Sequence, residues 1–167
     1  MWNLILVAFL EPVALGGEFP SGRWPLHITL VKFDVGSSPG GEAGGRDEVA
    51  ARVVASVDGA VKTALGTRLT IGDEAGFGLR QLVPVNVVEP HPRLQALHES
   101  LLREVQNLGA VVSTPAYTLQ NYRPHVSHQG DSRPHRGDAV VLDRVALVDM
   151  APDGDRRIRR VLELWTN

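Results

Sequence analysis

Hydrophobic residues recur along the chain in two spacings, which predict strands and helices. Short apolar or alternating runs predict β-strands at 3–10, 25–33, 67–72, 80–89, 123–129, 138–150 and 156–165. Apolar residues spaced by three and four positions predict amphipathic α-helices over 47–65 and 92–108. The resulting order is β-β-α-β-β followed by α-β-β-β, which looks like two similar halves.

The residues between these elements are typical of helix ends and loops. Asp47 is a suitable N-cap for the first helix, and Gly66 and Gly109 follow the ends of the two helices. The stretch 34–46 is rich in Gly, Ser and Pro, which predicts a flexible connector. We therefore expect an α+β protein in which helices pack on antiparallel sheets.

Composition narrows the class of protein. The chain has 167 residues, of which 43% are hydrophobic and 22% charged, as in a globular domain. It contains no cysteine, which excludes disulfides, thiolate metal ligands and cysteine catalysis. The apolar amino-terminal stretch MWNLILVAFLEP, residues 1–12, is too short to cross a bilayer and lacks the features of a signal peptide. We therefore expect a buried first strand, no membrane association and a cytoplasmic protein.

The charge balance limits the expected partners. The net charge is −2, from 17 basic and 19 acidic residues. A protein that binds long duplex nucleic acid non-specifically presents a strongly basic face, and this balance argues against one. A short or small phosphorylated ligand, held by a few local groups, remains compatible with it.

Candidate chemistry lies in two similar stretches, WPLHITLVKF at 24–33 and YRPHVSHQG at 122–130. Each contains a histidine followed two positions later by a hydroxyl residue: His27 with Thr29, and His125 with Ser127. Residues two apart on a strand point to the same face, so each pair shares a face while its apolar neighbours point to the core. We expect two strands that line one polar cleft.

This pattern suits phosphodiester chemistry. Histidine titrates near neutral pH, so one imidazole can take a proton from water while the other gives one to the departing ribose oxygen. The two hydroxyl groups can donate hydrogen bonds to the phosphate oxygens, on which negative charge lies in the transition state. Such a reaction needs no metal and no other cofactor.

The two motifs, HITL and HVSH, resemble the paired signatures of the two-histidine (2H) phosphoesterase superfamily. The bacterial 2′-5′ RNA ligase and RNA 2′,3′-cyclic phosphodiesterase branch is the most similar, and the resemblance covers nearly the whole chain. It implies one bilobal domain over 1–167, with two pseudo-symmetric lobes, each an antiparallel sheet with a packed helix, and a cleft between them. It also implies catalytic roles for His27 and His125, and phosphate binding by Thr29 and Ser127.

The chain differs from the family pattern at two positions. Ser127 replaces the commoner threonine, which preserves the hydroxyl donor. His128 stands where the family usually has an apolar residue, and strand alternation turns it away from the cleft. A zinc site formed by His125, His128 and His135 is an alternative, but His125 and His128 should lie on opposite faces and no carboxylate or cysteine completes the set.

Several neighbouring residues are candidates for substrate binding. Arg123 can bind a second phosphate, and Tyr122 and Trp24 can stack on a base, although packing roles are open for all three. Arg133 and Arg136 either form a basic rim over the cleft or belong to a solvated loop.

These observations predict a metal-independent phosphodiesterase that acts on 2′,3′-cyclic phosphates or 2′-5′ linkages of RNA or oligonucleotides, with 2′-5′ RNA ligation as a related activity. We expect a monomer whose partner is a short RNA, an oligonucleotide or a cyclic nucleotide. The alternatives are a hydrolase of cyclic oligonucleotide messengers and a non-catalytic module that binds nucleotides or RNA.

Overall fold

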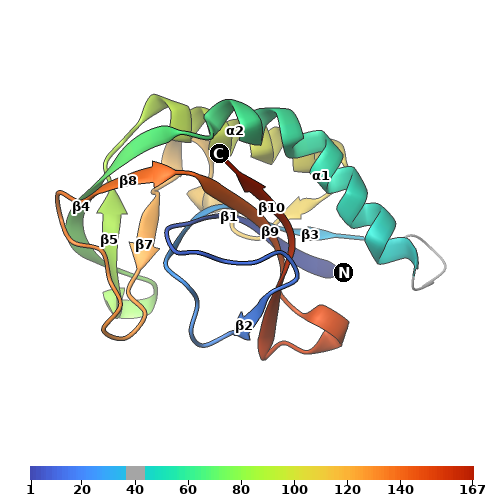
Figure 1. The fold of residues 1–167 in the computed structure, drawn as a ribbon, viewed down its shortest axis with the longest axis horizontal. Helices are drawn as coiled ribbons and strands as arrows, with labels where there is room; N and C mark the ends of the chain where they lie inside the picture. The colour runs from blue at the N-terminus through green and yellow to red at the C-terminus, as the bar shows by residue number, and fades with distance from the viewer. Residues whose placement is uncertain (37–43) are drawn as a thin grey trace.

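The computed structural model describes residues 1–36 and 44–167. Its strands follow one another through a 10-stranded, mainly antiparallel sheet in the order β2-β10-β9-β1-β3-β7-β5-β4-β8, with β6 beside β3 (Figure 1). The strands are β1 (Trp2–Phe9), β2 (Glu18–Pro20), β3 (His27–Val35), β4 (Thr67–Phe77), β5 (Val83–Val88), β6 (Val111–Val112), β7 (His125–Ser127), β8 (Ala139–Leu142), β9 (Arg144–Asp149) and β10 (Ile158–Thr166). The helices are α1 (Gly44–Ala64) and α2 (Pro92–Asn107). The expected α+β class is confirmed.

The sheet consists of two sets of strands that meet between β3 and β7. One set contains β2, β10, β9, β1 and β3, and the other contains β7, β5, β4 and β8. Across the junction, Ile28 of β3 pairs with Val126 of β7. Both side chains are almost fully buried, so the two sets are joined through the core.

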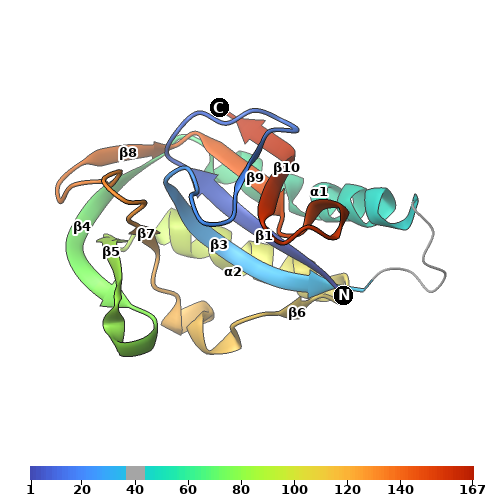
Figure 2. The ribbon, with the colours of Figure 1, turned by 90° about the horizontal axis from the view of Figure 1, so that it is seen from below.

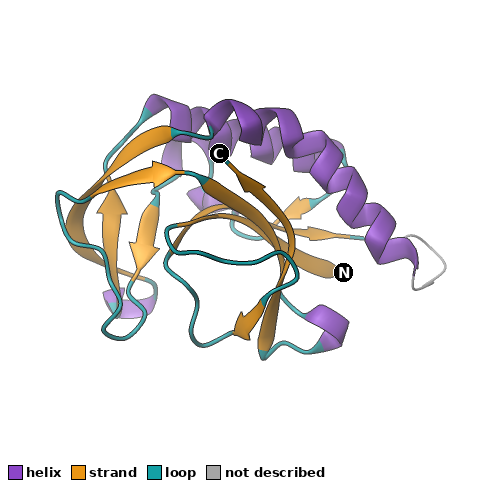
Figure 3. Ribbon diagram, in the orientation of Figure 1, coloured by secondary structure: helices purple, strands orange, loops and turns teal. Residues whose placement is uncertain are grey.

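Both helices lie on the same side of the sheet and contact each other (Figure 3). Their apolar faces are buried, with Val53, Val57 and Val61 on α1 and Leu101 and Val105 on α2. These residues belong to one hydrophobic cluster that also contains apolar side chains from both sets of strands. The two halves therefore share a single core beneath the helices. None of the described helices is long and apolar enough to span a membrane.

A smaller apolar cluster lies on the opposite side of β1, β9 and β10. Val7 and Phe9 of β1 are buried there, and Phe19 and Trp24 from the segment between β1 and β3 pack against them. Figure 2 shows this segment crossing over the strands. The stretch that connects the first two predicted strands therefore covers the sheet and also contains β2.

The structure corrects the predictions at Asp143, at the start of α1 and in the connector. The predicted strand at 138–150 is two strands that separate at Asp143: β8 pairs with β4, whereas β9 pairs with β1 and β10. Helix α1 begins at Gly44, so Asp47 lies in its first turn instead of at the N-cap. The ends of the predicted connector 34–46 belong to β3 and α1, and its middle, 37–43, lies outside the described residues.

Candidate active site

The pairing of β3 with β7 brings the two sequence motifs together. Because Ile28 and Val126 face the core, the residues on either side of them face the opposite side of the sheet. These neighbours are the polar residues of the motifs: His27 and Thr29 on β3, and His125 and Ser127 on β7. The expected common polar face is thus present at the junction of the two strand sets.

The antiparallel register also arranges the four side chains as two opposed pairs. It sets His27 opposite Ser127 and Thr29 opposite His125. The two histidines therefore lie on a diagonal, and diagonal neighbours on antiparallel strands are usually about 7–8 Å apart, with a somewhat shorter Cβ–Cβ distance. This spacing leaves room for one phosphate between the imidazoles, with a hydroxyl on each side.

The two histidines are held by the same kind of hydrogen bond. Nδ1 of His27 lies 2.9 Å from the carbonyl oxygen of Pro25, and Nδ1 of His125 lies 2.8 Å from that of Arg123. A carbonyl can only accept, so Nδ1 is the donor in both rings. In the neutral state each Nε2 then carries a lone pair and is the nitrogen that is able to exchange a proton with a ligand.

The surroundings of both rings disfavour the charged form. Burial lowers the pKa of His27, repulsion from His125 lowers it further, and the bond to the Pro25 carbonyl acts in the opposite direction. Burial also lowers the pKa of His125, with a smaller contribution from the Arg123 charge. Two charged imidazoles repel each other, so the pair favours states in which at most one of the two rings is charged.

An aromatic side chain contacts each imidazole. The ring centroids of Trp24 and His27 are 4.5 Å apart, and those of Phe77 and His125 are 4.3 Å apart. The Arg123 guanidinium lies 4.6 Å from the centroid of the Phe77 ring, so Phe77 contacts both Arg123 and His125. Phe77 was missed by the sequence analysis because it ends β4, far in the chain from either motif.

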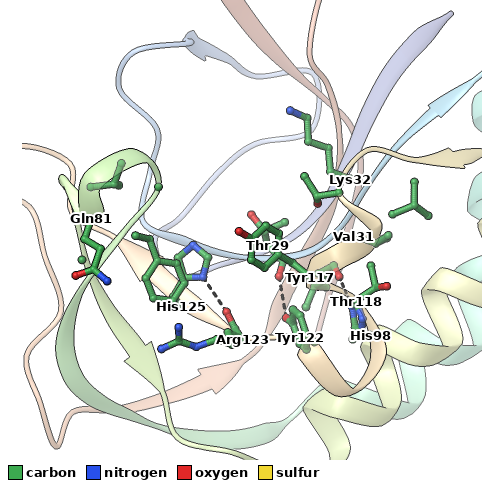
Figure 4. Close-up of a pocket in the computed structure, with 17 residues that line it drawn as sticks. Thr29, Val31, Lys32, Gln81, His98, Tyr117, Thr118, Tyr122, Arg123 and His125 are labelled. Atoms are coloured by element: carbon green, nitrogen blue, oxygen red, sulfur yellow. Dashed lines mark hydrogen bonds between the residues drawn. The ribbon is translucent and has the colours of Figure 1, made fainter.

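A pocket of about 530 Å³ opens beside this face (Figure 4). Its walls come from β3, from the hairpin at 76–83 between β4 and β5, and from the segment 112–125. Four predicted site residues line it: Thr29, Tyr122, Arg123 and His125. Trp24, His27 and Ser127 lie outside its lining, so the pocket extends from the His125 side of the site.

A β-bulge interrupts β3 at the edge of the pocket. Leu6 of β1 pairs with Val31. The next residue of β1, Val7, pairs with Thr29 instead of Leu30. Leu30 is therefore an extra residue, and both Leu30 and Val31 are buried in the core. Because of the extra residue, the side chains of β3 after the bulge face the opposite side of the sheet from the one that regular alternation would give them.

Two side chains bind the backbone carbonyls at this bulge. The hydroxyl of Tyr122 donates to the carbonyl oxygen of Thr29 at 2.8 Å, and Nδ1 of His98 donates to that of Leu30 at 2.7 Å. Nε2 of His98 accepts from the backbone N–H of Leu119 at 3.0 Å. Burial raises the pKa of Tyr122, which keeps its hydroxyl protonated as a donor. Tyr122 thus lines the pocket while its hydroxyl is bound to the motif strand.

The other candidate residues have partners outside the pocket. Nε2 of His128 donates to Oδ1 of Asn86 at 2.7 Å, and Asn86 pairs with Val126, on the face opposite His125. Arg133 and Arg136 form ion pairs with Glu74 and Asp73 of β4. Within residues 1–36 and 44–167, no three histidine or acidic side chains are grouped as metal ligands.

Comparison with known proteins identifies the family of the chain. The family model described as the 2′-5′ RNA ligase superfamily matches residues 10–149. The chain belongs to this superfamily. The predicted relationship to the 2H phosphoesterases is thereby confirmed.

Solved structures share the fold of this 2′-5′ RNA ligase superfamily member. A phosphoesterase is 18% identical, with a TM-score of 0.58 and coverage of 99% of this chain and 97% of its own. Escherichia coli LigT complexed with NADP+ is 16% identical, with a TM-score of 0.56 and coverage of 99% and 96%. LigT complexed with ATP is 18% identical, with a TM-score of 0.52 and coverage of 99% and 97%. No curated protein sequence matches the chain.

Proposed function

We propose that the protein is a metal-independent phosphodiesterase that opens 2′,3′-cyclic phosphates or 2′-5′ linkages of RNA or oligonucleotides. The observation that carries this proposal is the matched pair of histidines at the β3–β7 junction. Each is fixed through Nδ1 by a backbone carbonyl, and each keeps Nε2 for proton exchange. His98 makes the same kind of Nδ1 bond, but its Nε2 accepts a backbone N–H, whereas an acid–base group needs that nitrogen for its ligand.

The proposed reaction uses the two Nε2 atoms in opposite protonation states. One imidazole takes a proton from water as the water oxygen forms a bond to phosphorus. The other, protonated, gives its proton to the ribose oxygen as the phosphorus–oxygen bond to that ribose breaks. When the 5′-hydroxyl of a second RNA takes the place of water, the same two transfers join its oxygen to the cyclic phosphate as the phosphorus bond to one ribose oxygen breaks, which accounts for ligation within the same site.

The phosphate is expected to bind between the histidines. The hydroxyl groups of Thr29 and Ser127 donate to its non-bridging oxygens, where charge increases in the transition state. The charge of Arg123 lies beside His125 and supports binding of an anion there. LigT has been solved with NADP+ and with ATP, which supports a nucleotide or oligonucleotide as the ligand class.

Hydrolysis of adenosine 2′,3′-cyclic phosphate in excess EDTA tests the proposal. We expect turnover that persists in the chelator and is lost in His27→Ala and His125→Ala. Loss of turnover in EDTA, with recovery on addition of zinc or manganese, would contradict the metal-independent mechanism. Binding of short RNA without turnover would favour the non-catalytic module, and turnover of cyclic di- or trinucleotides alone would favour the messenger hydrolase.

A further inference from the structure

All charged side chains that line the pocket beside the proposed catalytic face are basic. Lys32 and Arg123 are its charged lining residues, and among the described residues no carboxylate lines it. In residues 1–36 and 44–167, neither side chain takes part in an ion pair. In a chain with a net charge of −2, this local excess favours an anionic ligand.

The β3 bulge determines where Lys32 lies. Without an extra residue, strand alternation would turn Lys32 away from Thr29. Because Leu30 and Val31 both face the core, Lys32 returns to the side on which Thr29 lies. Thr29 and Lys32 pair with Val7 and Ile5, which are two residues apart on β1, so at about 3.4 Å per strand residue the two backbone positions are separated by about 7 Å. Figure 4 shows Thr29 between His125 and Lys32 in that view.

The space beyond Thr29 also has a surface for a base. The side chain of Tyr117, which lines the pocket, is 67% exposed. Phe77 also lines the pocket, but it is half-buried and contacts His125 and Arg123, so Tyr117 is the exposed ring. Exposed aromatic rings next to cationic groups are the usual elements of a single-stranded nucleic-acid subsite, since bases stack on rings while phosphates bind the cations.

Both walls of the pocket are held in defined conformations. Leu119, next to Tyr117 and Thr118, has a φ of 57°, and its carbonyl and N–H are bound by Gln95 and His98 of α2. On the opposite wall, a Cβ at Gly76 would clash with the carbonyl oxygen of Gln81. The hairpin closes this tightly only because position 76 has no side chain. A preformed pocket lowers the ordering cost of binding.

We propose that this pocket is a second nucleotide subsite, in which Lys32 binds the next phosphate of an oligonucleotide and Tyr117 stacks on its base. The inference rests on the proposed function, because the reacting phosphate must lie between His27 and His125. It names the substrate as RNA of two or more nucleotides ending in a 2′,3′-cyclic phosphate. In such an RNA the next phosphate is on the 5′ side, and that phosphate is the one assigned to Lys32.

Kinetics with a substrate series test the subsite. The series consists of adenosine 2′,3′-cyclic phosphate and the di- and triadenylates that end in the same group. The measured quantity is the ratio of kcat/KM for the dinucleotide to kcat/KM for the mononucleotide. We expect a ratio well above one in the wild type, about tenfold lower in Lys32→Met, and retained in Lys32→Arg. Tyr117→Ala should also lower the ratio, and Tyr117→Phe should preserve it.

The control is Lys62→Met, which removes the same charge from the exposed surface of α1, where Lys62 pairs with Asp58. It should leave the ratio at the wild-type value. Salt dependence is a second readout: loss of one phosphate contact should reduce the slope of log(kcat/KM) against log[salt] for the dinucleotide by about 0.7. Thermal unfolding of each variant shows that it is folded.

The outcomes separate this inference from the proposed function. Turnover of both substrates with a ratio that Lys32→Met leaves unchanged overturns the subsite and leaves the phosphodiesterase intact. Absence of turnover with every substrate overturns the proposed function, and the subsite is then judged by binding of diadenylate 2′-phosphate in fluorescence competition. Weaker binding in Lys32→Met but not in Lys62→Met supports the subsite, and equal binding by all three proteins overturns it.

Discussion

The rings of His98 and Tyr122 stack face to face, with centroids 3.9 Å apart and an interplanar angle of 6°. Their polar atoms bind two consecutive carbonyls of β3, those of Thr29 and Leu30. A bulge takes carbonyls out of the regular ladder, and buried carbonyls need other donors. The stacked pair supplies these donors, so the orientation of Thr29 depends on side chains from outside the motif.

Tyr122→Phe removes the hydroxyl that binds the Thr29 carbonyl and keeps the stacked ring. The free energy of unfolding should fall by about 1–2 kcal/mol, since a buried carbonyl loses its donor. We expect kcat to fall more than KM rises, because the hydroxyl of Thr29 is proposed to stabilise transition-state charge. Urea unfolding and steady-state kinetics measure the two effects.

Thr63→Val is the matched control for a lost hydroxyl. Thr63 donates to the carbonyl oxygen of Gly59 on the exposed side of α1, far from the motifs in the chain. Its kcat should equal that of the wild type. A Tyr122→Phe protein with wild-type kcat would contradict the positioning of Thr29 by Tyr122.

His27→Ala and His125→Ala should each lower the rate by about 10²–10⁴, the usual contribution of one acid–base group. The double variant should be little slower than either single variant, because groups that act as a unit are not additive. Single-turnover hydrolysis of a cyclic phosphate measures all three. Fully additive losses would show that the histidines do not act in one step.

His128→Ala is the internal control for the second motif. Its ring binds Asn86 on the opposite face of β7, so the folded variant should keep the wild-type rate. The free energy of unfolding should still fall by about 1–2 kcal/mol, because Oδ1 of the buried Asn86 loses its donor. A rate as low as that of His125→Ala would contradict the register of β7.

The pH profile of kcat/KM should be bell-shaped and displaced to low pH. One histidine must be neutral and the other protonated, and the pKa of each is lowered from 6.5, chiefly by burial. The maximum is therefore expected on the acidic side of pH 6.5. Phe77→Ala admits water to His125, which should raise its pKa and move one limb to higher pH. A profile that Phe77→Ala does not change would contradict this cause of the shift.

Stability should decrease as the solution becomes acidic, in part because of His98. Burial lowers its pKa in the folded protein, whereas the unfolded chain has the ordinary value near 6.5. Below pH 6.5 the unfolded state therefore binds a proton that folded His98 does not, and the free energy of unfolding falls until the folded pKa is reached. In urea unfolding from pH 8 to 5, His98→Gln should show a shallower slope, by up to about 1.4 kcal/mol per pH unit. Equal slopes would contradict this role.

Much of the fold could be predicted from local patterns. The second helix was expected at 92–108 and spans Pro92–Asn107, because Pro92 and Gly109 mark its ends and its apolar face has a regular period. The prediction of a single strand at 138–150 was wrong, because apolar residues continue on both sides of Asp143 and hide the break. Only the tertiary pairing shows that the residues before Asp143 pair with β4, whereas those after it pair with β1 and β10.

Part of the candidate site could likewise be predicted from local patterns, and part depends on tertiary structure. Strand alternation predicted that the histidine and hydroxyl of each motif share a face, and the register of Ile28 with Val126 agrees with it. The catalytic roles stay predictions. Phe77 and His98 come from other elements, and only a polar residue on the apolar face of the second helix pointed to His98. The place of Lys32 depends on a bulge, for which two adjacent apolar residues in the motif strand were the only signal.

The break at Asp143 has a consequence for the order in which the molecule can be assembled during synthesis. β8 pairs with β4 in one strand set, and β9 inserts between β1 and β10 in the other. Strand β1, near the amino terminus, has both of its neighbours, β3 and β9, only after Leu4 has paired with Asp149. Contacts this distant in the chain close late and slow folding. Until residues 139–149 of a nascent chain have left the ribosome, β8 and β9 are missing and both strand sets are incomplete.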